Sequence, residues 1–181
     1  MIMKIEETKI NGLFLIKPKI FSDNRGKFIK VYHDKTFNEF GLDARFVESY
    51  YSVSNKNVIR GMHFQIPPED HNKLVYVTAG KIIDVVLDIR KKSKTFGEFE
   101  TFELSSDNGY CVYIPAGCAH GFISLRDNTI VTYMQTSMFD SKCDKGIKYN
   151  SFGFDWNCDN PILSDRDRKF PMLCDYDSPF E

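Results

Sequence analysis

Features that mark several classes of protein are missing from this sequence of 181 residues. Its formal net charge is only −1, which gives no long-range attraction to nucleic acid or to an anionic membrane surface. No apolar run approaches the ~18 residues of a membrane-spanning helix, and the charged N-terminal stretch lacks the apolar core of a signal peptide. We therefore expect a cytoplasmic protein with no nucleic-acid partner and no membrane partner.

Cysteine is scarce and irregularly spaced. The five cysteines are an odd number, and no two of them form a C-x-x-C pair. A disulfide framework or a zinc knuckle is therefore not expected, and free thiols fit a reducing compartment. The five residues are Cys111, Cys118, Cys143, Cys158 and Cys174.

Aromatic residues are plentiful instead, which favours strands over a helical bundle. Phe occurs 16 times and Tyr 9 times. Residues 73–77 and 82–89 are two apolar runs on either side of Ala79-Gly80, a pattern that predicts a β-hairpin. Many short runs separated by turns predict one all-β domain over residues 1–181, built as a sandwich or small barrel.

Two segments depart from the strand pattern. Residues 35–41 predict a short helix that ends at Gly41. The tail from Gly146 onward is rich in Asp, Pro and Ser and predicts irregular structure, although it carries Trp156 and several Phe residues. We expect these aromatic side chains to pack the tail onto the barrel.

Two of the four histidines lie in suggestive motifs. Gly109, the stretch Pro115–Ala119 and then His120 fit the G-x5-P-x-G-x2-H pattern of cupin barrels. In this pattern Pro and Gly end one strand in a tight turn, and the histidine enters the next strand. His63 lies in an apolar and aromatic run, Val58–Gln65. The chain therefore predicts a cupin-type antiparallel β-barrel, or jelly roll, with short helices and an irregular C-terminal tail.

A histidine on a strand is more often a core or surface residue than a catalyst, so the neighbours of His63 decide its interpretation. Arg60 precedes it and Lys73 follows in the next run, and such cations are rarely buried without a partner. Together they suggest an anion or a developing negative charge inside the barrel. Arg60 and His63 would lie on opposite faces of a regular strand, and a bulge at Gly61 would bring both inside.

A metal-dependent cupin is the competing interpretation. Such proteins usually carry an H-x-H pair, whereas the tripeptide His63–Gln65 lacks the second histidine. Glu69 and His71 lie nearby, in a loop-like stretch with Pro67-Pro68, and do not provide three ligands at inner-strand spacing. We therefore expect neither a metal nor another cofactor.

These motifs resemble those of the dTDP-4-dehydrorhamnose 3,5-epimerase family, over about residues 10–171. The resemblance implies epimerisation of a nucleoside-diphosphate 4-keto-6-deoxy sugar at carbon 3, carbon 5 or both, in the biosynthesis of rhamnose-type sugars of surface polysaccharides. It also implies a metal-free homodimer, to which the apolar segment 13–20 would contribute a crossing strand. The landmarks are Phe21–Gly26, Arg60–Gln65, Asn72–Val75, Ile83–Arg90, Ser93–Gly97, Ile114–Phe122, Gly146–Asn150, Asp155-Trp156 and Pro161–Asp167.

The resemblance further implies roles for single residues. His63 is the base that removes the proton next to the ketone, and Asp167 orients it. Tyr133 is the acid that returns a proton to the opposite face, and Lys73 lies near the sugar's 4-oxygen. We expect His63, Lys73, Tyr133 and His120 to face one interior pocket. The implied substrate-binding residues, with the two arginines as diphosphate or oxyanion contacts, are Arg25, Phe28, Lys30, Glu48, Arg60 and His120.

Lys30, Glu48, Met134 and the pair Met138-Phe139 depart from the family's usual residues. Lys30 stands where Glu is usual, and Glu48 stands where Gln is usual, at the nucleotide end of the pocket. A carboxylate only accepts hydrogen bonds, so Glu48 would suit the amino-bearing base of a CDP or GDP sugar better than thymine. In the alternative, Lys30 and Glu48 pair with each other and aromatics such as Tyr50 or Phe139 hold thymine. A single-carbon epimerase, a ketoisomerase and a non-catalytic cupin are the other interpretations.

Overall fold

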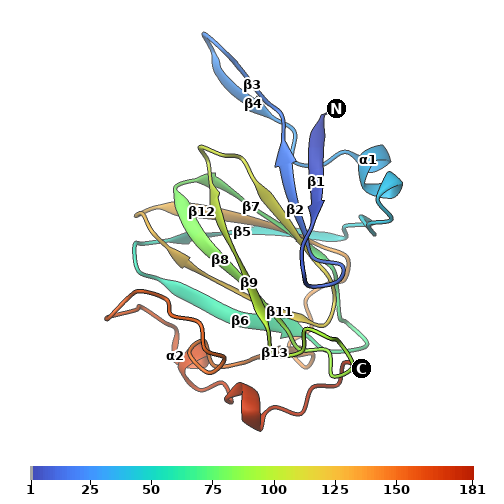
Figure 1. Cartoon of the computed structure of the whole chain (residues 1–181). Coiled ribbons are helices and arrows are strands. Elements are labelled where there is room, and N and C mark those ends of the chain that lie inside the picture. Colours follow the sequence, from blue (N-terminus) through green and yellow to red (C-terminus); the bar gives the residue numbers. More distant parts are fainter. Residues whose placement is uncertain (1) are drawn as a thin grey trace.

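Two antiparallel sheets face each other and enclose much of the apolar core (Figure 1). The structure is a computed structural model that describes residues 2–181. The six-stranded sheet has the spatial order β1 (Met3–Glu7), β2 (Phe14–Pro18), β10 (Cys111–Ile114), β7 (Lys73–Ala79), β12 (Thr129–Gln135) and β5 (Glu48–Ser54). The five-stranded sheet has the order β13 (Asp144–Gly146), β6 (Ile59–Gln65), β11 (Cys118–Ser124), β8 (Lys81–Asp88) and β9 (Phe99–Ser105). The predicted all-β jelly roll is confirmed.

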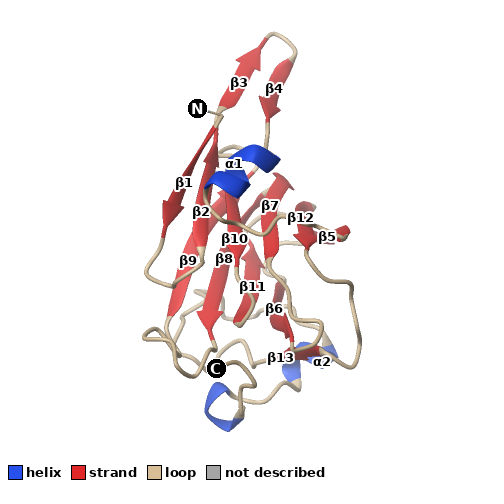
Figure 2. Cartoon of the chain, turned by 90° about the vertical axis from the view of Figure 1, so that its right-hand side faces the viewer, coloured by secondary structure: helices blue, strands red, loops and turns tan. Residues whose placement is uncertain are grey.

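A separate hairpin and three short helical segments complete the chain (Figure 2). The helix predicted at residues 35–41 is confirmed, and Gly41 follows its end with a φ of +69°. No helix among residues 2–181 is long and apolar enough to cross a membrane. The elements are β3 (Ile20–Asp23) paired with β4 (Gly26–Ile29), the helices α1 (Asp34–Glu39) and α2 (Asp165–Arg168), and the 3-10 helix η1 (Leu173–Asp175).

Alternation along the strands builds the core between the sheets. Val131 and Tyr133 of β12 are buried, while Thr132 between them is only half-buried. They meet Val75 of β7, Val86 of β8 and Phe122 of β11 in one apolar cluster. Each such side chain contributes roughly 1.5–3 kcal/mol when it leaves water. The period of two therefore fixes which residues of each strand face the interior.

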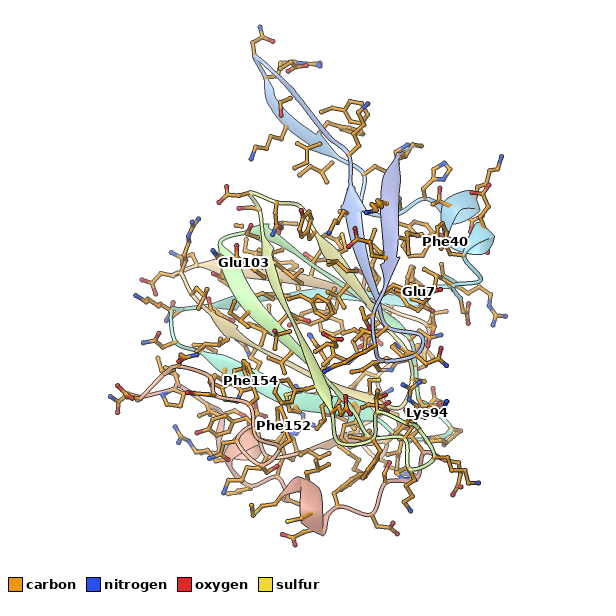
Figure 3. The ribbon with its side chains drawn as sticks, in the orientation of Figure 1. Glu7, Phe40, Lys94, Glu103, Phe152 and Phe154 are labelled. Atoms are coloured by element: carbon orange, nitrogen blue, oxygen red, sulfur yellow. The ribbon has the colours of Figure 1, made fainter. Side chains whose placement is uncertain are left out.

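The tail covers the outer face of the five-stranded sheet, as the sequence predicts. Phe152 and Phe154, labelled in Figure 3, lie edge-on against Phe99 of β9 at 5.7 and 5.3 Å between ring centroids. Trp156 is buried, and its indole N–H donates to the carbonyl oxygen of Tyr149 at 2.8 Å. Because both faces of this sheet are covered, every residue of β11 is buried.

The hairpin predicted across Ala79-Gly80 is wrong. Both strands exist, but β7 pairs with β10 and β12, whereas β8 pairs with β11 and β9 in the other sheet. Gly80 has a φ of +81°, and a β-carbon there would lie 2.9 Å from the Cα of Thr129. The glycine therefore forms a corner between the sheets. Local turn chemistry marks a reversal of the chain, but it does not say whether the two flanking strands pair.

Candidate active site

A cavity between the two sheets collects most of the polar residues singled out from the sequence. His63, Lys73, His120 and Tyr133 all line it, as predicted. Its volume is about 190 Å³. The cavity adjoins a wider pocket of about 330 Å³, which shares His63 and Lys73. The other residues that line the cavity are Tyr50, Ser52, Arg60 and Phe122.

The two sheets supply different chemical groups. His63 and His120 lie directly opposite each other on β6 and β11 of the five-stranded sheet. Lys73 and Tyr133 come from the neighbouring strands β7 and β12 of the six-stranded sheet. A molecule held between the sheets therefore has the histidines on one side and the tyrosine and lysine on the other.

The bulge expected at Gly61 is present. His63 pairs with His120 and Arg60 pairs with Phe122, so three steps along β6 match two steps along β11. Gly61 has a φ of +137°, and a β-carbon there would lie 2.5 Å from the Cα of Gly121. The additional residue places Arg60 and His63 on the same face, which a regular strand would not do.

His63 is held by a carboxylate from the distant tail. Its Nε2 lies 2.8 Å from Oδ1 of Asp167, and the side chain is 34% exposed. The N–H of Gly61 donates to Oδ2 of Asp167 at 3.3 Å, and Ser164 caps the short helix α2 that carries it. Burial alone would raise the pKa of Asp167, but the hydrogen bonds from His63 and Gly61 hold it below its usual value. With Nε2 bound to the carboxylate, Nδ1 is the ring nitrogen left for other chemistry.

Lys73 is buried without an ionic partner. It is 6% exposed, and no carboxylate in residues 2–181 lies within ion-pair distance of its ammonium. Burial lowers its pKa to about 8, although the charges of Asp84 and Asp144 oppose this shift. A cation kept in such surroundings attracts a negative charge on whatever enters the cavity.

Tyr133 faces the cavity with a protonated hydroxyl. Its oxygen lies 3.3 Å from Oγ of Ser52, and its ring stacks on that of Tyr50 at 4.7 Å. Burial raises the pKa of Tyr133 well above its usual value, so the phenol stays protonated at neutral pH. The Tyr50 hydroxyl donates to Oε1 of Gln135 at 2.9 Å and fixes the stack.

Arg60 spans the mouth of the cavity. Arg60 lies on β6, and its side chain contacts the edge strand β5 of the other sheet. There Nε donates to Oγ of Ser54 at 3.0 Å and Nη2 donates to the carbonyl oxygen of Val53 at 3.1 Å. These bonds fix a permanent positive charge next to the cavity.

A second histidine–aspartate pair was missed in the sequence. Nε2 of His120 lies 2.6 Å from Oδ1 of Asp84, and both side chains are buried. Burial lowers the pKa of His120, and Asp84 opposes the shift. The signal was the position of Asp84 within the apolar run Ile82–Leu87, because an aspartate is rarely buried without a partner.

Glu48 lines the wider pocket but does not pair with Lys30. Its Oε2 accepts a hydrogen bond from the backbone N–H of Phe139 at 2.6 Å. No ion pair joins Glu48 to Lys30 within the described chain, so the pairing considered from the sequence is absent. The carboxylate instead holds the segment that carries the exposed Phe139 at the rim.

Three of the predicted substrate-binding residues lie away from this cavity. Arg25 and Phe28 belong to the β3–β4 hairpin, which projects from the barrel (Figure 1). Arg25 pairs with Asp23 at 2.6 Å, Phe28 is 62% exposed, and both line a separate surface depression. Lys30 follows the hairpin. Within one chain these residues do not line the cavity, because β3 and β4 pair only with each other, and their role as substrate contacts stays a prediction.

Other residues of the wider pocket were not singled out as ligands. Arg166 pairs with Asp144 at 2.6 Å on its rim, and His71 forms part of its wall. Among residues 2–181 no three His, Cys, Asp or Glu side chains form a cluster able to hold a metal ion.

The fold and the cavity define the class, a cupin-type barrel equipped to move protons on and off a bound molecule. A family profile of dTDP-4-dehydrorhamnose 3,5-epimerases matches residues 7–175, and the chain belongs to this family. The dTDP-4-dehydrorhamnose 3,5-epimerase of Methanothermobacter thermautotrophicus is 38% identical over 172 residues, which cover 92% of each protein.

Solved structures agree with this assignment. The crystal structure of dTDP-4-dehydrorhamnose 3,5-epimerase from Sulfolobus tokodaii is 36% identical, with a TM-score of 0.93 over 100% of both chains. The dTDP-6-deoxy-D-glucose-3,5-epimerase of Legionella pneumophila, crystallised with dTDP-4-keto-L-rhamnose, has a TM-score of 0.92 at 36% identity. The alignment covers 97% of this chain and 95% of that one.

Proposed function

We propose that the protein epimerises a dTDP-linked 4-keto-6-deoxy sugar at carbons 3 and 5, in the biosynthesis of a rhamnose-type deoxysugar. One observation carries the proposal: His63 and Tyr133 face one cavity from opposite sheets, and the buried Lys73 lines the same cavity. Family membership and the complex of the Legionella enzyme with dTDP-4-keto-L-rhamnose support it.

The first half-reaction removes a proton from the carbon next to the ketone. Nδ1 of His63 is the free nitrogen, and Asp167 stabilises the positive charge that the ring gains. Loss of this proton leaves an enolate, and the former ketone oxygen carries the negative charge. The ammonium of Lys73, in its water-poor site, stabilises that oxygen, and this kind of stabilisation is usually the largest single contribution to the rate.

The second half-reaction returns a proton to the other face. A single group that returned its own proton would restore the original configuration, so inversion needs an acid on the opposite side. Tyr133 meets this need because it lies on the other sheet and remains protonated. His120, held by Asp84, completes the wall, and Arg60 places a permanent charge where a diphosphate would lie.

The nucleotide we propose is dTDP. The expectation of an amino-bearing base, based on Glu48, finds no support among the relatives, which are named as dTDP-sugar enzymes. The Glu48 carboxylate already accepts the N–H of Phe139, so one of its oxygens has a partner before any base is bound.

We propose a homodimer in which the hairpin of one chain reaches the pocket of the other. The hairpin carries Phe21 and Phe28, both exposed, and Arg25, so one chain leaves an apolar and cationic surface uncovered. The edge strand β5 also exposes Tyr51 and Val53. Such a dimer would bring Arg25, Phe28 and Lys30 to a nucleotide site. A monomeric mass at micromolar concentration in sedimentation equilibrium would contradict it.

We place the enzyme in the cytoplasm. All five cysteines of the described chain are free, which fits a reducing compartment. Fractionation of the source cells, followed by immunodetection, tests this placement.

Deuterium incorporation tests the proposed reaction. The wild-type protein is incubated in deuterated water with the dTDP-, CDP- and GDP-linked 4-keto-6-deoxy sugars, and the product is analysed by NMR. We expect two deuterons, at carbons 3 and 5, with the dTDP sugar preferred. One deuteron would indicate a single-carbon epimerase, and none with any sugar would overturn the proposal.

A further inference from the structure

His71, a buried polar residue in the wall of the wider pocket, has no role in the proposed mechanism. His71 lies in the segment that leads into β7, is only 7% exposed, and forms part of the pocket wall. Its Nδ1 has neighbours at hydrogen-bond distance, but its Nε2 is buried without any partner in residues 2–181. Buried polar atoms of this kind are uncommon and call for an explanation.

The surrounding bonds decide which nitrogen of His71 carries the proton. Gln65 has two amide hydrogens, and its shortest contacts are the carbonyl oxygens of Glu69 at 2.7 Å and Met138 at 3.0 Å. The hydroxyl of Ser137 donates to the oxygen of Glu69 at 2.7 Å. Its Oγ is therefore free to accept from Nδ1–H of His71 at 3.2 Å. Nδ1 is the protonated nitrogen, and Nε2 presents a lone pair.

The ring stays neutral, so this lone pair is kept. Burial lowers the pKa of His71 to about 3, and the charge of Lys73 adds to the shift. Two carboxylates on the pocket wall already have a donor each, since Glu48 accepts from Phe139 and Asp144 pairs with Arg166. Nε2 of His71 is thus a fixed hydrogen-bond acceptor that has no donor.

We propose that Nε2 of His71 accepts a hydrogen bond from an N–H or O–H group of the bound nucleotide sugar, which makes it a specificity-determining residue. This inference rests on the proposed function. Two parts of the ligand offer that chemistry, the imide N–H of the thymine base and the hydroxyls of the sugars. A ligand with a methyl group or an acceptor at this point leaves Nε2 unpaired and binds more weakly.

Two substitutions separate this role from a structural one. In His71→Asn the side-chain amide reaches the Nδ1 position and keeps the bond to Ser137, but no atom stands at Nε2. In His71→Gln the carbonyl oxygen reaches the Nε2 position, and the donor to Ser137 is lost. We expect His71→Asn to weaken binding of dTDP or of the full nucleotide sugar about tenfold, or ~1.4 kcal/mol. We expect His71→Gln to recover most of that loss.

Three ligands identify the donor in titration calorimetry and steady-state kinetics. If the base N–H is the donor, His71→Asn weakens dTDP about tenfold, and N3-methyl-dTDP binds the wild type and His71→Asn equally. If a hydroxyl of the transferred sugar is the donor, dTDP binding is unchanged and KM for the nucleotide sugar rises about tenfold. His33→Asn is the matched control, because within residues 2–181 the His33 ring hydrogen-bonds only with Thr36, at the start of α1.

The remaining outcomes overturn the inference. Equal affinities for wild type, His71→Asn and His71→Gln with every ligand would mean that the ligand makes no bond to Nε2. A loss in His71→Gln that is absent in His71→Asn would mean that the ring only anchors Ser137. Thermal melts identify variants that fail to fold. Deuterium incorporation by the wild type fails only if the proposed function fails, so the two hypotheses are tested separately.

Discussion

Two histidine–aspartate pairs lie on adjacent strands of the five-stranded sheet, with similar bonds and different surroundings. His63 meets Asp167 at 2.8 Å and is one-third exposed, whereas His120 meets Asp84 at 2.6 Å with both residues buried. The aspartate of the first pair comes from the distant helix α2, and that of the second comes from the adjacent strand β8. Burial disfavours the charged form of the second ring and lowers the pKa of His120, whereas the first ring keeps access to solvent.

Removing the first histidine should have the largest effect. His63→Ala deletes the ring nitrogen that the proposed mechanism uses as the base, and general-base catalysis contributes about 10²–10⁴-fold. We expect deuterium incorporation to fall about 10³-fold, measured by NMR in deuterated water. Deuterium incorporation by His63→Ala at the wild-type rate would show that His63 is not the base.

Tyr133→Phe should separate the two half-reactions. The ring and its stack on Tyr50 remain, and only the hydroxyl is lost. Proton removal by His63 continues, so deuterium enters, while the rate of inversion falls about 10²-fold. The measurement compares deuterium incorporation with the formation of epimerised product. Epimerisation at the wild-type rate would show that Tyr133 is not the acid.

Matched substitutions of the two aspartates test the comparison directly. Asp167→Asn should lower kcat about 10- to 100-fold with little loss of stability, because the carboxylate that orients the reactive His63 ring is lost. Asp84→Asn should instead lower stability by about 1.5–3 kcal/mol, as expected for a buried hydrogen bond to a charged group. Stopped assays and urea titrations supply both numbers for each variant. An equal loss of kcat in Asp167→Asn and Asp84→Asn would mean that both histidine–aspartate pairs take part in catalysis.

The pH dependence of kcat/KM should arise from Lys73, on the six-stranded sheet. Its pKa of about 8 means that the free enzyme loses this charge as pH rises through 8, so kcat/KM should fall about tenfold per pH unit above it. Stability should move the other way. Between pH 8 and 10.5 the unfolded chain holds a proton that the native state has released, so this group raises the free energy of unfolding with pH.

Lys73→Arg is the control for this prediction. Arginine stays charged throughout the range, so the alkaline fall should disappear even if the rate is lower. A fall that persists in Lys73→Arg would assign the titration to another group.

Much of the site could be predicted because its residues lie in motifs with a mechanical reason. The turn before His120 and the bulge at Gly61 both follow from where proline and glycine permit the chain to turn or to widen a strand. The partner of His120 was missed, because Asp84 lies 36 residues away in an apolar run that carries no local sign of its neighbour. His71 was interpreted only as part of a loop, since the contacts that orient its ring come from Gln65 and from the distant Ser137.

The amino-acid sequence by itself determined the all-β class, the short helix before Gly41 and the aromatic tail. These follow from periodicity, from backbone preferences and from side-chain chemistry, which are local properties. The tertiary structure alone decided that β7 and β8 separate into two sheets and that His63 and Tyr133 meet from opposite sides. It also placed Arg25 and Phe28 on a projecting hairpin and gave His63 and His120 each its own aspartate. Pairing between strands and burial depend on contacts between residues far apart in the chain, so no local pattern fixes them.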